Sequence, residues 1–195
     1  MKNAIWLKAT NKSSYGLSSR MEDFYYLFDM DGTLFFTDEL NNESYNSALA
    51  DHNFKPIHNM KRITRKIVKG FYPELTKGEI TGLINRKQDY FIENIRRIQE
   101  NNFLFAILKR LEKEKCILWT SAERRRVDGI IREFSLQRFF DKVILSGKQC
   151  ISDDIHSICL ELSCTRDQLL VFENDVSVVK KLEGHHVSCL LFIRA

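Results

Sequence analysis

The feature that most constrains the fold of this chain is the stretch from Phe24 to Thr37, FYYLFDMDGTLFFT. It opens on an apolar run that polar residues and a glycine follow, a pattern typical of a buried strand in a parallel sheet. In open α/β sheets the reacting groups lie just beyond the carboxyl ends of the strands. The stretch therefore predicts that Asp29 and Asp31 stand at the edge of a sheet, where Gly32 lets the chain turn sharply.

Two aspartates separated by one residue can divide a phosphoryl transfer between them. A carboxylate can attack phosphorus and form an aspartyl-phosphate, and we assign this role to Asp29. A second carboxylate can protonate the leaving oxygen and later take a proton from water, and we assign this role to Asp31. Mg²⁺ would screen the two anions that must meet. The alternative interpretation is a strand followed by an ordinary Asp-Gly turn.

The string DMDGTL after an apolar strand resembles the first motif of the haloacid dehalogenase (HAD) superfamily, whose members are mostly Mg²⁺-dependent phosphatases and phosphomutases. The resemblance covers the chain from Phe24 to its end and implies an α/β fold. In that fold a Rossmann-like parallel sheet has helices on both faces and the first strand is central. Gly32 and Thr33 of the motif would contact substrate. The family's dehalogenases lack the second acid, so Asp31 favours phosphate chemistry over halide expulsion.

Helical periodicity with almost no strand signal follows this motif. Thr76 and Glu79 form a capping-box pattern ahead of a helix with one apolar face. We predict a small all-helical cap inserted after the first strand, and the alternative is a group of extra helices packed beside the sheet. The predicted boundaries are 1–20 for a flexible leader, 21–38 and 101–195 for the core, and 39–100 for the cap.

The resemblance implies that a type-one cap of this kind closes over the active site and selects the substrate, since a lid excludes water and completes the pocket. Basic residues of the cap are candidates for holding an anion, although solvated helix faces carry such residues anyway. The candidates are Lys61, Arg62, Arg65, Lys66, Arg86 and Lys87.

A second strand is predicted at Cys116 to Trp119, and Thr120 and Ser121 follow it. A hydroxyl at a strand end, followed by a helix, is a phosphate-binding arrangement, because the helix start offers unbonded N–H groups. This position matches the second HAD motif. The resemblance therefore implies that Thr120 binds phosphate and that Ser121 supplies a backbone N–H. The alternative for Ser121 is a helix N-cap.

Charged residues open two later helices. Arg124 to Arg126 are either a cluster that faces an anion or part of a solvated helix face, and the solvated face is favoured. Asp153 and Asp154 begin the other helix and are interpreted as helix caps rather than catalytic groups.

A third strand is predicted at Val143 to Leu145, and Lys148 follows it. A lysine there fits the third HAD motif, in which the ammonium bridges the nucleophilic carboxylate and the phosphate. The chain departs from the common pattern, since related enzymes have a longer loop and a Lys-Pro pair, whereas Gln149 follows here. We assign the role to Lys148, with Lys142 as the substitute and a surface lysine as the alternative.

A fourth strand is predicted at Leu169 to Phe172, ahead of Glu173, Asn174 and Asp175. This resembles the fourth HAD motif, where related enzymes read VFED and the Asp contacts Mg²⁺. Here Asn174 takes the place of that Asp. An amide oxygen can bind Mg²⁺ but brings no charge, so affinity should fall unless Asp175 compensates. The implied metal ligands are Asp29, Asp31 through its backbone carbonyl, and Asn174 or Asp175.

Composition narrows the class of protein. A formal net charge of +4 suits an anionic substrate without requiring nucleic acid, and 44% hydrophobic residues predict a globular chain. Five cysteines without CxxC pairing are typical of reduced thiols in a cytoplasmic protein. No apolar run approaches membrane-spanning length.

These observations predict a Mg²⁺-dependent phosphatase that acts on a small phosphorylated metabolite, with no membrane partner. Two alternatives stay open. One is a phosphomutase similar to β-phosphoglucomutase, which would use the same core but protect the aspartyl-phosphate from water. The other is a catalytically weakened HAD domain that serves as a binding or regulatory module, for which Asn174 is the argument.

Overall fold

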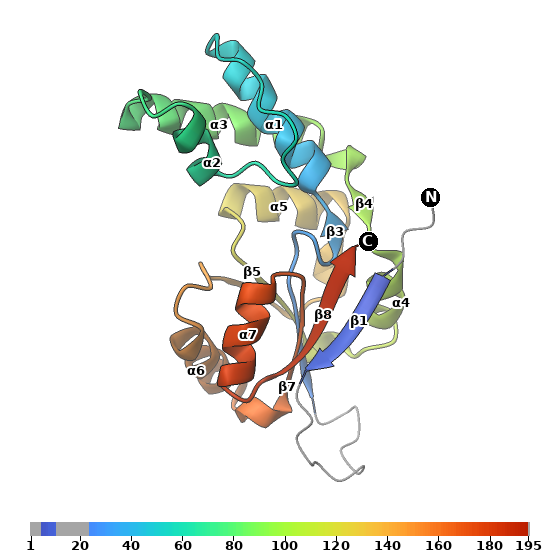
Figure 1. Ribbon diagram of the computed structural model, residues 1–195. Helices are drawn as coiled ribbons and strands as arrows, with labels where there is room; N and C mark the ends of the chain where they lie inside the picture. The colour runs from blue at the N-terminus through green and yellow to red at the C-terminus, as the bar shows by residue number, and fades with distance from the viewer. Residues whose placement is uncertain (1–4, 11–23, 195) are drawn as a thin grey trace. The chain divides into compact units, whose positions relative to one another are not determined.

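The computed structural model describes residues 5–10 and 24–194, and the chain forms two compact units (Figure 1). Unit 1 comprises Met1–Leu34, Asn101–Ala122 and Leu136–Ala195. Unit 2 comprises Phe35–Glu100 and Glu123–Ser135. Within the described residues, no helix has the length and apolarity needed to cross a membrane.

Unit 1 is built on a six-stranded sheet in the order β1-β8-β7-β2-β5-β6. Strands β8, β7, β2, β5 and β6 run parallel to one another, and β1 pairs antiparallel with β8. The predicted Rossmann-like parallel sheet is therefore confirmed, and the strand that precedes the DMDGTL motif lies in its centre. The strands are β1 (Ile5–Thr10), β2 (Tyr25–Phe28), β5 (Cys116–Thr120), β6 (Lys142–Leu145), β7 (Leu169–Glu173) and β8 (Ser188–Arg194).

The two faces of this sheet follow from the period of two along each strand. In β7, Val171 joins a hydrophobic cluster with α6 (Ile151–Leu162) and α7 (Val176–Gly184). On the other face Phe172 stacks on Phe28 with ring centroids 4.3 Å apart. The helix α4 (Asn102–Leu108) lies on this aromatic face, because Phe103 contacts Phe192. Helices thus cover both faces, as predicted. Single 3₁₀ turns lie at Lys113–Lys115, Leu136–Arg138 and Arg166–Gln168.

The strand β1 differs from the expected flexible leader at 1–20. Ile5–Thr10 pair residue by residue with β8, from Ile5 opposite Arg194 to Thr10 opposite Cys189. Polar residues surround this short strand, and its partner lies at the other end of the sequence, so local composition gave no indication of it. The remainder of the predicted leader lies outside the described residues.

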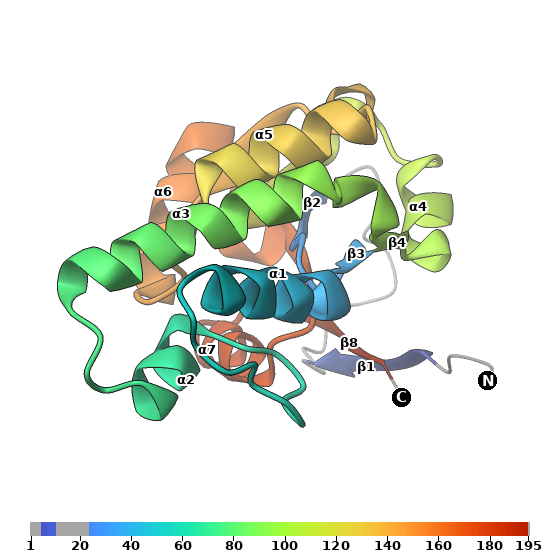
Figure 2. The ribbon, with the colours of Figure 1, turned by 90° about the horizontal axis from the view of Figure 1, so that it is seen from above.

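Unit 2 is mainly helical, with helices α1 and α3 side by side in both views (Figures 1 and 2). The capping box predicted at Thr76 and Glu79 is confirmed, with each side chain bonded to the other residue's backbone N–H. The elements are β3 (Phe35–Phe36), α1 (Asp38–Asp51), α2 (Arg65–Phe71), α3 (Lys77–Glu93), a 3₁₀ turn at Ile95–Arg97, β4 (Gln99–Glu100) and α5 (Arg124–Glu133).

Helix α5 belongs to unit 2, although the sequence grouped it with the core. Its Arg125 pairs with Asp89 of α3 at 2.7 Å. Its Gly129 packs so closely that a Cβ there would lie 3.2 Å from Cδ1 of Ile95. Contacts across helices far apart in the sequence therefore decide the grouping, and the predicted role of this unit as a cap stays a prediction.

Candidate functional site

The sheet of unit 1 brings three strand ends together at one edge. Central β2 lies between β5 and β7, all three are parallel, and their carboxyl ends carry Asp29, Thr120 and Glu173. The N–H of Asp29 still donates to the carbonyl of Phe172 at 2.9 Å, which fixes the start of the loop. The chain runs from β2 to β5 and β6 on one side and then returns to β7 on the other. Such a switch point is where open α/β sheets bind ligands.

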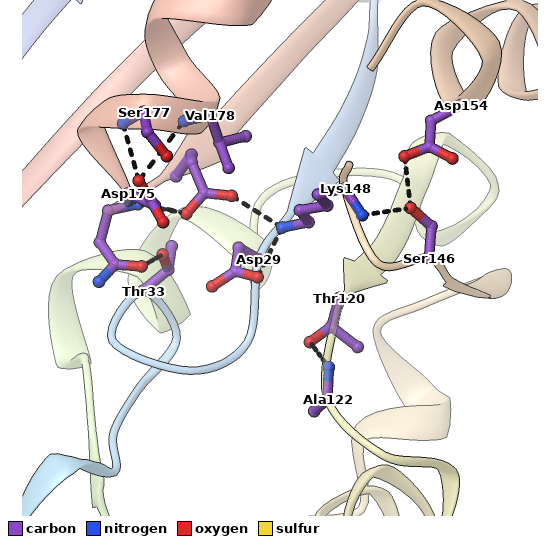
Figure 3. A network of polar contacts seen from close by, with 12 residues as sticks. Asp29, Thr33, Thr120, Ala122, Ser146, Lys148, Asp154, Asp175, Ser177 and Val178 are labelled. Atoms are coloured by element: carbon purple, nitrogen blue, oxygen red, sulfur yellow. Dashed lines mark hydrogen bonds and ion pairs between the residues drawn. The ribbon is translucent and has the colours of Figure 1, made fainter. Parts of the chain in front are cut away.

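Lys148 is the centre of a buried ionic cluster at this edge. Its Nζ lies 2.7 Å from Oδ1 of Asp29 and 2.7 Å from Oε2 of Glu173. All three side chains are buried, and the ammonium also lies 4.7 Å from the centroid of the Trp119 ring. Figure 3 shows Lys148 reaching to Asp29 from the loop after β6. The lysine predicted after the third strand therefore contacts the predicted nucleophile.

The pKa values of Asp29 and Lys148 in this cluster are both raised, but for different reasons. Burial, and then the negative charge of Glu173, raise the pKa of Asp29 above its ordinary value, and Lys148 opposes that rise. Burial lowers the pKa of Lys148, but the charges of Asp29 and Glu173 outweigh burial and raise it. The lysine thus stays cationic, and it compensates two carboxylates that would otherwise be buried without a partner.

A second layer of contacts holds Lys148 in place. The residue has a φ of 50°, in the left-handed region that non-glycine residues rarely adopt. Its backbone N–H donates to Oγ of Ser146 at 3.0 Å, and that hydroxyl donates to Oδ2 of Asp154. Asp154 therefore fixes the lysine loop as well as standing in the first turn of α6, as predicted for an acidic helix start. The short loop without a proline positions its lysine in this way.

The turn after β2 packs against the end of β7. Gly32 has a φ of 84°, and a Cβ there would lie 2.3 Å from the Asn174 amide. The Oγ1 of Thr33 lies 3.1 Å from Oδ1 of Asn174. The carbonyl of Thr33 accepts from Nδ2 of Asn101 at 3.0 Å. The predicted residues Gly32 and Thr33 therefore lie against Asn174, and glycine is required for both conformation and space.

Glu173 and Asp175 each have a structural task beside the site. Oε1 of Glu173 accepts from the backbone N–H groups of Asn174 at 2.8 Å and Asp175 at 2.9 Å. Oδ1 of Asp175 accepts from the N–H groups of Ser177 at 2.7 Å and Val178 at 3.4 Å, so it caps α7. Although burial raises the pKa of Asp175, the hydrogen bonds at this cap lower it below its ordinary value. The predicted compensation by Asp175 at the metal would break this cap.

Thr120 ends β5 as predicted, and the following helix opens at Arg124, also as predicted. The buried Oγ1 of Thr120 accepts from the N–H of Ala122 at 3.2 Å, so the hydroxyl hydrogen can be donated elsewhere. Ser121 is exposed, and it is not the N-cap. Helix α5 begins at Arg124 with Glu123 as its N-cap. The alternative interpretation of Ser121 as the N-cap is therefore wrong, although Ser is the more usual cap.

Other predicted residues lie elsewhere. Lys142, the substitute for Lys148, stands at the start of β6 and pairs with Glu161 at 3.0 Å. Three residues at or beside the ionic cluster were not predicted as functional: Glu173, Ser146 and Asp154. A signal existed for Glu173, since it ends a buried strand beside the central one. The roles of Ser146 and Asp154 depend on how the loop folds back, which local patterns do not specify.

The groups that could bind a divalent cation offer the right element, oxygen, but carry little negative charge. The Asp29 carboxylate, the Asp31 carbonyl and the Asn174 amide offer oxygen atoms, which Mg²⁺ prefers. Only one of these three groups is an anion. Within residues 5–10 and 24–194, no group of three His, Cys, Asp or Glu side chains is arranged to hold a metal.

Unit 2 contains two buried cations of its own. Lys87 and Arg126 are only 5% and 3% exposed. Arg126 Cζ lies 3.7 Å from the centroid of Phe91, and Lys87 Nζ lies 5.6 Å from the same centroid. The favoured interpretation of Arg124 to Arg126 as a solvated face is therefore wrong for Arg126, whose guanidinium stacks on a ring.

A family model described as haloacid dehalogenase-like hydrolase matches residues 26–173. A search of the curated proteins finds no match.

Solved structures of the same fold are numerous. A predicted phosphoglycolate phosphatase from Haemophilus somnus has a TM-score of 0.72 at 18% identity, covering 87% of this chain and 84% of that one. CbbY from Rhodobacter sphaeroides, solved in complex with phosphate, has a TM-score of 0.69 at 16% identity, with 84% and 83% covered. A HAD hydrolase of family IA, variant 3, from Entamoeba histolytica has a TM-score of 0.68 at 17% identity, with 85% and 82% covered.

Proposed function

This chain belongs to the haloacid dehalogenase-like hydrolases, and on that premise we propose that it is a Mg²⁺-dependent phosphatase acting through an aspartyl-phosphate. The observation that carries the proposal is the 2.7 Å contact between Lys148 Nζ and Asp29 Oδ1 at the carboxyl end of the central strand. A buried ammonium beside a carboxylate keeps that carboxylate oriented and provides positive charge for a phosphate that approaches it.

The proposed reaction has two displacements. Asp29 attacks phosphorus, the bond to the leaving oxygen breaks, and Asp31 gives that oxygen its proton. Water then attacks the phosphorus of the aspartyl-phosphate, Asp31 takes a proton from it, and Asp29 leaves as a carboxylate. Thr120 and Lys148 hold phosphate oxygens during both steps, which the buried position of both side chains supports.

Mg²⁺, when bound, would screen the approach of two anions. The Asp29 carboxylate and the Asp31 carbonyl would hold it, and Asn174, the third ligand predicted from the sequence, brings no charge. The alternative use of Asp175 is disfavoured because its carboxylate caps α7.

The substrate class and setting are part of the proposal. A small phosphorylated metabolite suits a modest net charge of +4, and five free cysteines suit a cytoplasmic location. No membrane or nucleic-acid partner is proposed.

Phosphate release from a panel of phosphomonoesters, with and without Mg²⁺, tests the proposal. We expect turnover by the wild type in Mg²⁺ and none by Asp29→Asn, which keeps the size of the side chain but removes the nucleophile. Lys142→Met is the matched control, because its ammonium pairs with Glu161 outside the cluster. Absence of turnover on every ester would reject the phosphatase.

One observation favours a second candidate, a weakened domain retained as a binding or regulatory module. Asn174 stands where related enzymes have the metal-binding Asp. If the wild type is inactive and Asn174→Asp gains large activity, the result favours a domain that has lost catalysis over an active phosphatase.

A further inference from the structure

The side-chain amide of Asn174 stands among oxygen atoms. One of the two terminal amide atoms, Oδ1 or Nδ2, points into the protein, and we call it the inner atom. It lies 3.1 Å from Thr33 Oγ1, 3.2 Å from Glu173 Oε1 and 3.1 Å from the carbonyl oxygen of Asp31. If that inner atom is Oδ1, it accepts only from the hydroxyl of Thr33, and it faces a carboxylate and a carbonyl. If it is Nδ2, all three oxygen atoms can accept from it. The oxygen atom is then turned away from the Asp31 carbonyl.

Hydrogen-bond chemistry decides between these orientations. Carboxylate and carbonyl oxygens only accept, whereas a hydroxyl can accept as well as donate. If Oδ1 of Asn174 faces the Glu173 carboxylate and the Asp31 carbonyl, no hydrogen bond forms with either of them, and the oxygen atoms repel one another. In a half-buried position this orientation is unfavourable. The nitrogen therefore faces inward when no cation is present.

The surroundings leave little room for another arrangement. Glu173 cannot turn away, because its two oxygens already hold Lys148 and the N–H groups of Asn174 and Asp175. The turn is already packed against the amide, since a Cβ at Gly32 would lie 2.3 Å from it, so the turn has no space to come closer.

We propose that Asn174 acts as a hydrogen-bond donor that ties the turn after β2 to the end of β7, in place of a third metal ligand. The catalytic edge is then assembled without a cation, and Mg²⁺ binds through Asp29 and the Asp31 carbonyl with low affinity. This deepens the proposed function and rests on it only for the identity of the metal.

The substitution Asn174→Asp, which introduces the Asp found in related enzymes, tests whether residue 174 must donate a hydrogen bond. In Asn174→Asp, a carboxylate oxygen would lie against Glu173 Oε1 and the Asp31 carbonyl with no hydrogen to donate. Like charges at this distance repel in a buried setting, so the variant needs a cation between them. The metal-free variant should be less stable than the wild type, and Mg²⁺ should restore it.

Asn46→Asp is the matched control. Asn46 Nδ2 donates to the carbonyl of Ile57 at 3.1 Å, and its Oδ1 accepts from the Ile57 N–H at 2.9 Å. This substitution also removes an amide donor and adds a charge, but it lies in unit 2, on α1.

The experiment measures thermal midpoints in EDTA and in MgCl₂, and MgCl₂ binding by calorimetry, all without substrate. For the wild type we expect midpoints within about 1 °C of each other. For Asn174→Asp we expect a lower midpoint in EDTA, recovery in MgCl₂, and Mg²⁺ affinity at least about tenfold above the wild type. Asn46→Asp should lose stability equally in both media.

A wild-type midpoint that falls sharply in EDTA would overturn the inference, and this measurement needs no variant to fold. Equal or weaker Mg²⁺ binding by Asn174→Asp would overturn it as well. Neither readout involves turnover. A protein that hydrolyses no ester but gives the expected midpoints and affinities would refute the phosphatase alone.

Discussion

At the scale of single residues, the ion pairs of Lys148 dominate the energetics of the site. One ammonium balances two carboxylates, and all three groups are buried. Such an arrangement contributes little when complete, because desolvation opposes the attraction, but removing one partner leaves charge buried and uncompensated.

Lys148→Met should therefore destabilise the protein by about 3–5 kcal/mol. Urea denaturation measures this, with Lys142→Met as the control. Lys142 pairs with Glu161 at the surface, so its loss should change stability by no more than about 1 kcal/mol. Equal effects of the two substitutions would contradict the assigned importance of the buried cluster.

The same variant should respond to pH in a definite direction. Burial and Glu173 already raise the pKa of Asp29 in the wild type, and losing the lysine removes the opposing charge. The native variant then binds more protons than its unfolded state, so its stability rises as pH falls through the raised pKa. Denaturation midpoints of Lys148→Met and wild type should therefore converge as the pH is lowered from about 8 towards about 5, since the pKa of Asp29 is already raised to about 7 in the wild type. A gap that widens on acidification would contradict this account.

At the scale of elements, the turn after β2 is the tightest fit in the site. Gly32 combines a φ of 84° with an approach that leaves no space for a Cβ. Gly32→Ala should destabilise the protein by about 1–3 kcal/mol and lower turnover, since the turn carries both aspartates. Gly70→Ala is the control, because Gly70 lies in α2 and a Cβ added there would meet no heavy atom within 4 Å. It should be neutral or stabilising by up to about 1 kcal/mol.

Identical stability losses at Gly32 and Gly70 would show that close approach to Asn174 has no energetic weight. Circular dichroism with chemical denaturation is sufficient for the comparison, and phosphate release gives the second readout.

Elements with a strong local pattern were predictable from the sequence. The apolar run before Asp29, the capping box at Thr76 and the strands before Thr120 and Glu173 all lie where they were predicted. Strand β1 was not predictable, since only its pairing with β8 defines it. Helix α5 opens at Arg124 as predicted, but Glu123, rather than the alternative Ser121, caps it.

Within the site, residues that directly follow strands were easier to predict than residues that support them. Asp29 and Lys148 follow apolar runs, and the structure brings them into contact. Ser146 and Asp154 act through a folded loop, and the orientation of Asn174 depends on three neighbours from two segments. Such roles depend on contacts between distant parts of the chain, which residue spacing does not encode.

At the scale of the whole molecule, the chain passes from one unit to the other four times. Helix α5 lies between two strands of the unit 1 sheet in sequence but packs with α3. Amides of α5 should therefore exchange with deuterium together with those of α3, as one cooperative group. The strands β5 and β6 should exchange separately. Native-state exchange under increasing denaturant measures this, and co-exchange of α5 with β5 would contradict the grouping.

In the proposed reaction Asp29 is the nucleophile, and Lys148 orients it and supplies positive charge. The most direct test is to mix the enzyme with a phosphomonoester that it hydrolyses, quench in acid, and locate covalent phosphate by mass spectrometry. We expect phosphate on the peptide that contains Asp29, and we expect hydroxylamine to release it, as it does an acyl phosphate. Phosphate on another residue, or turnover retained by Asp29→Asn, would contradict it.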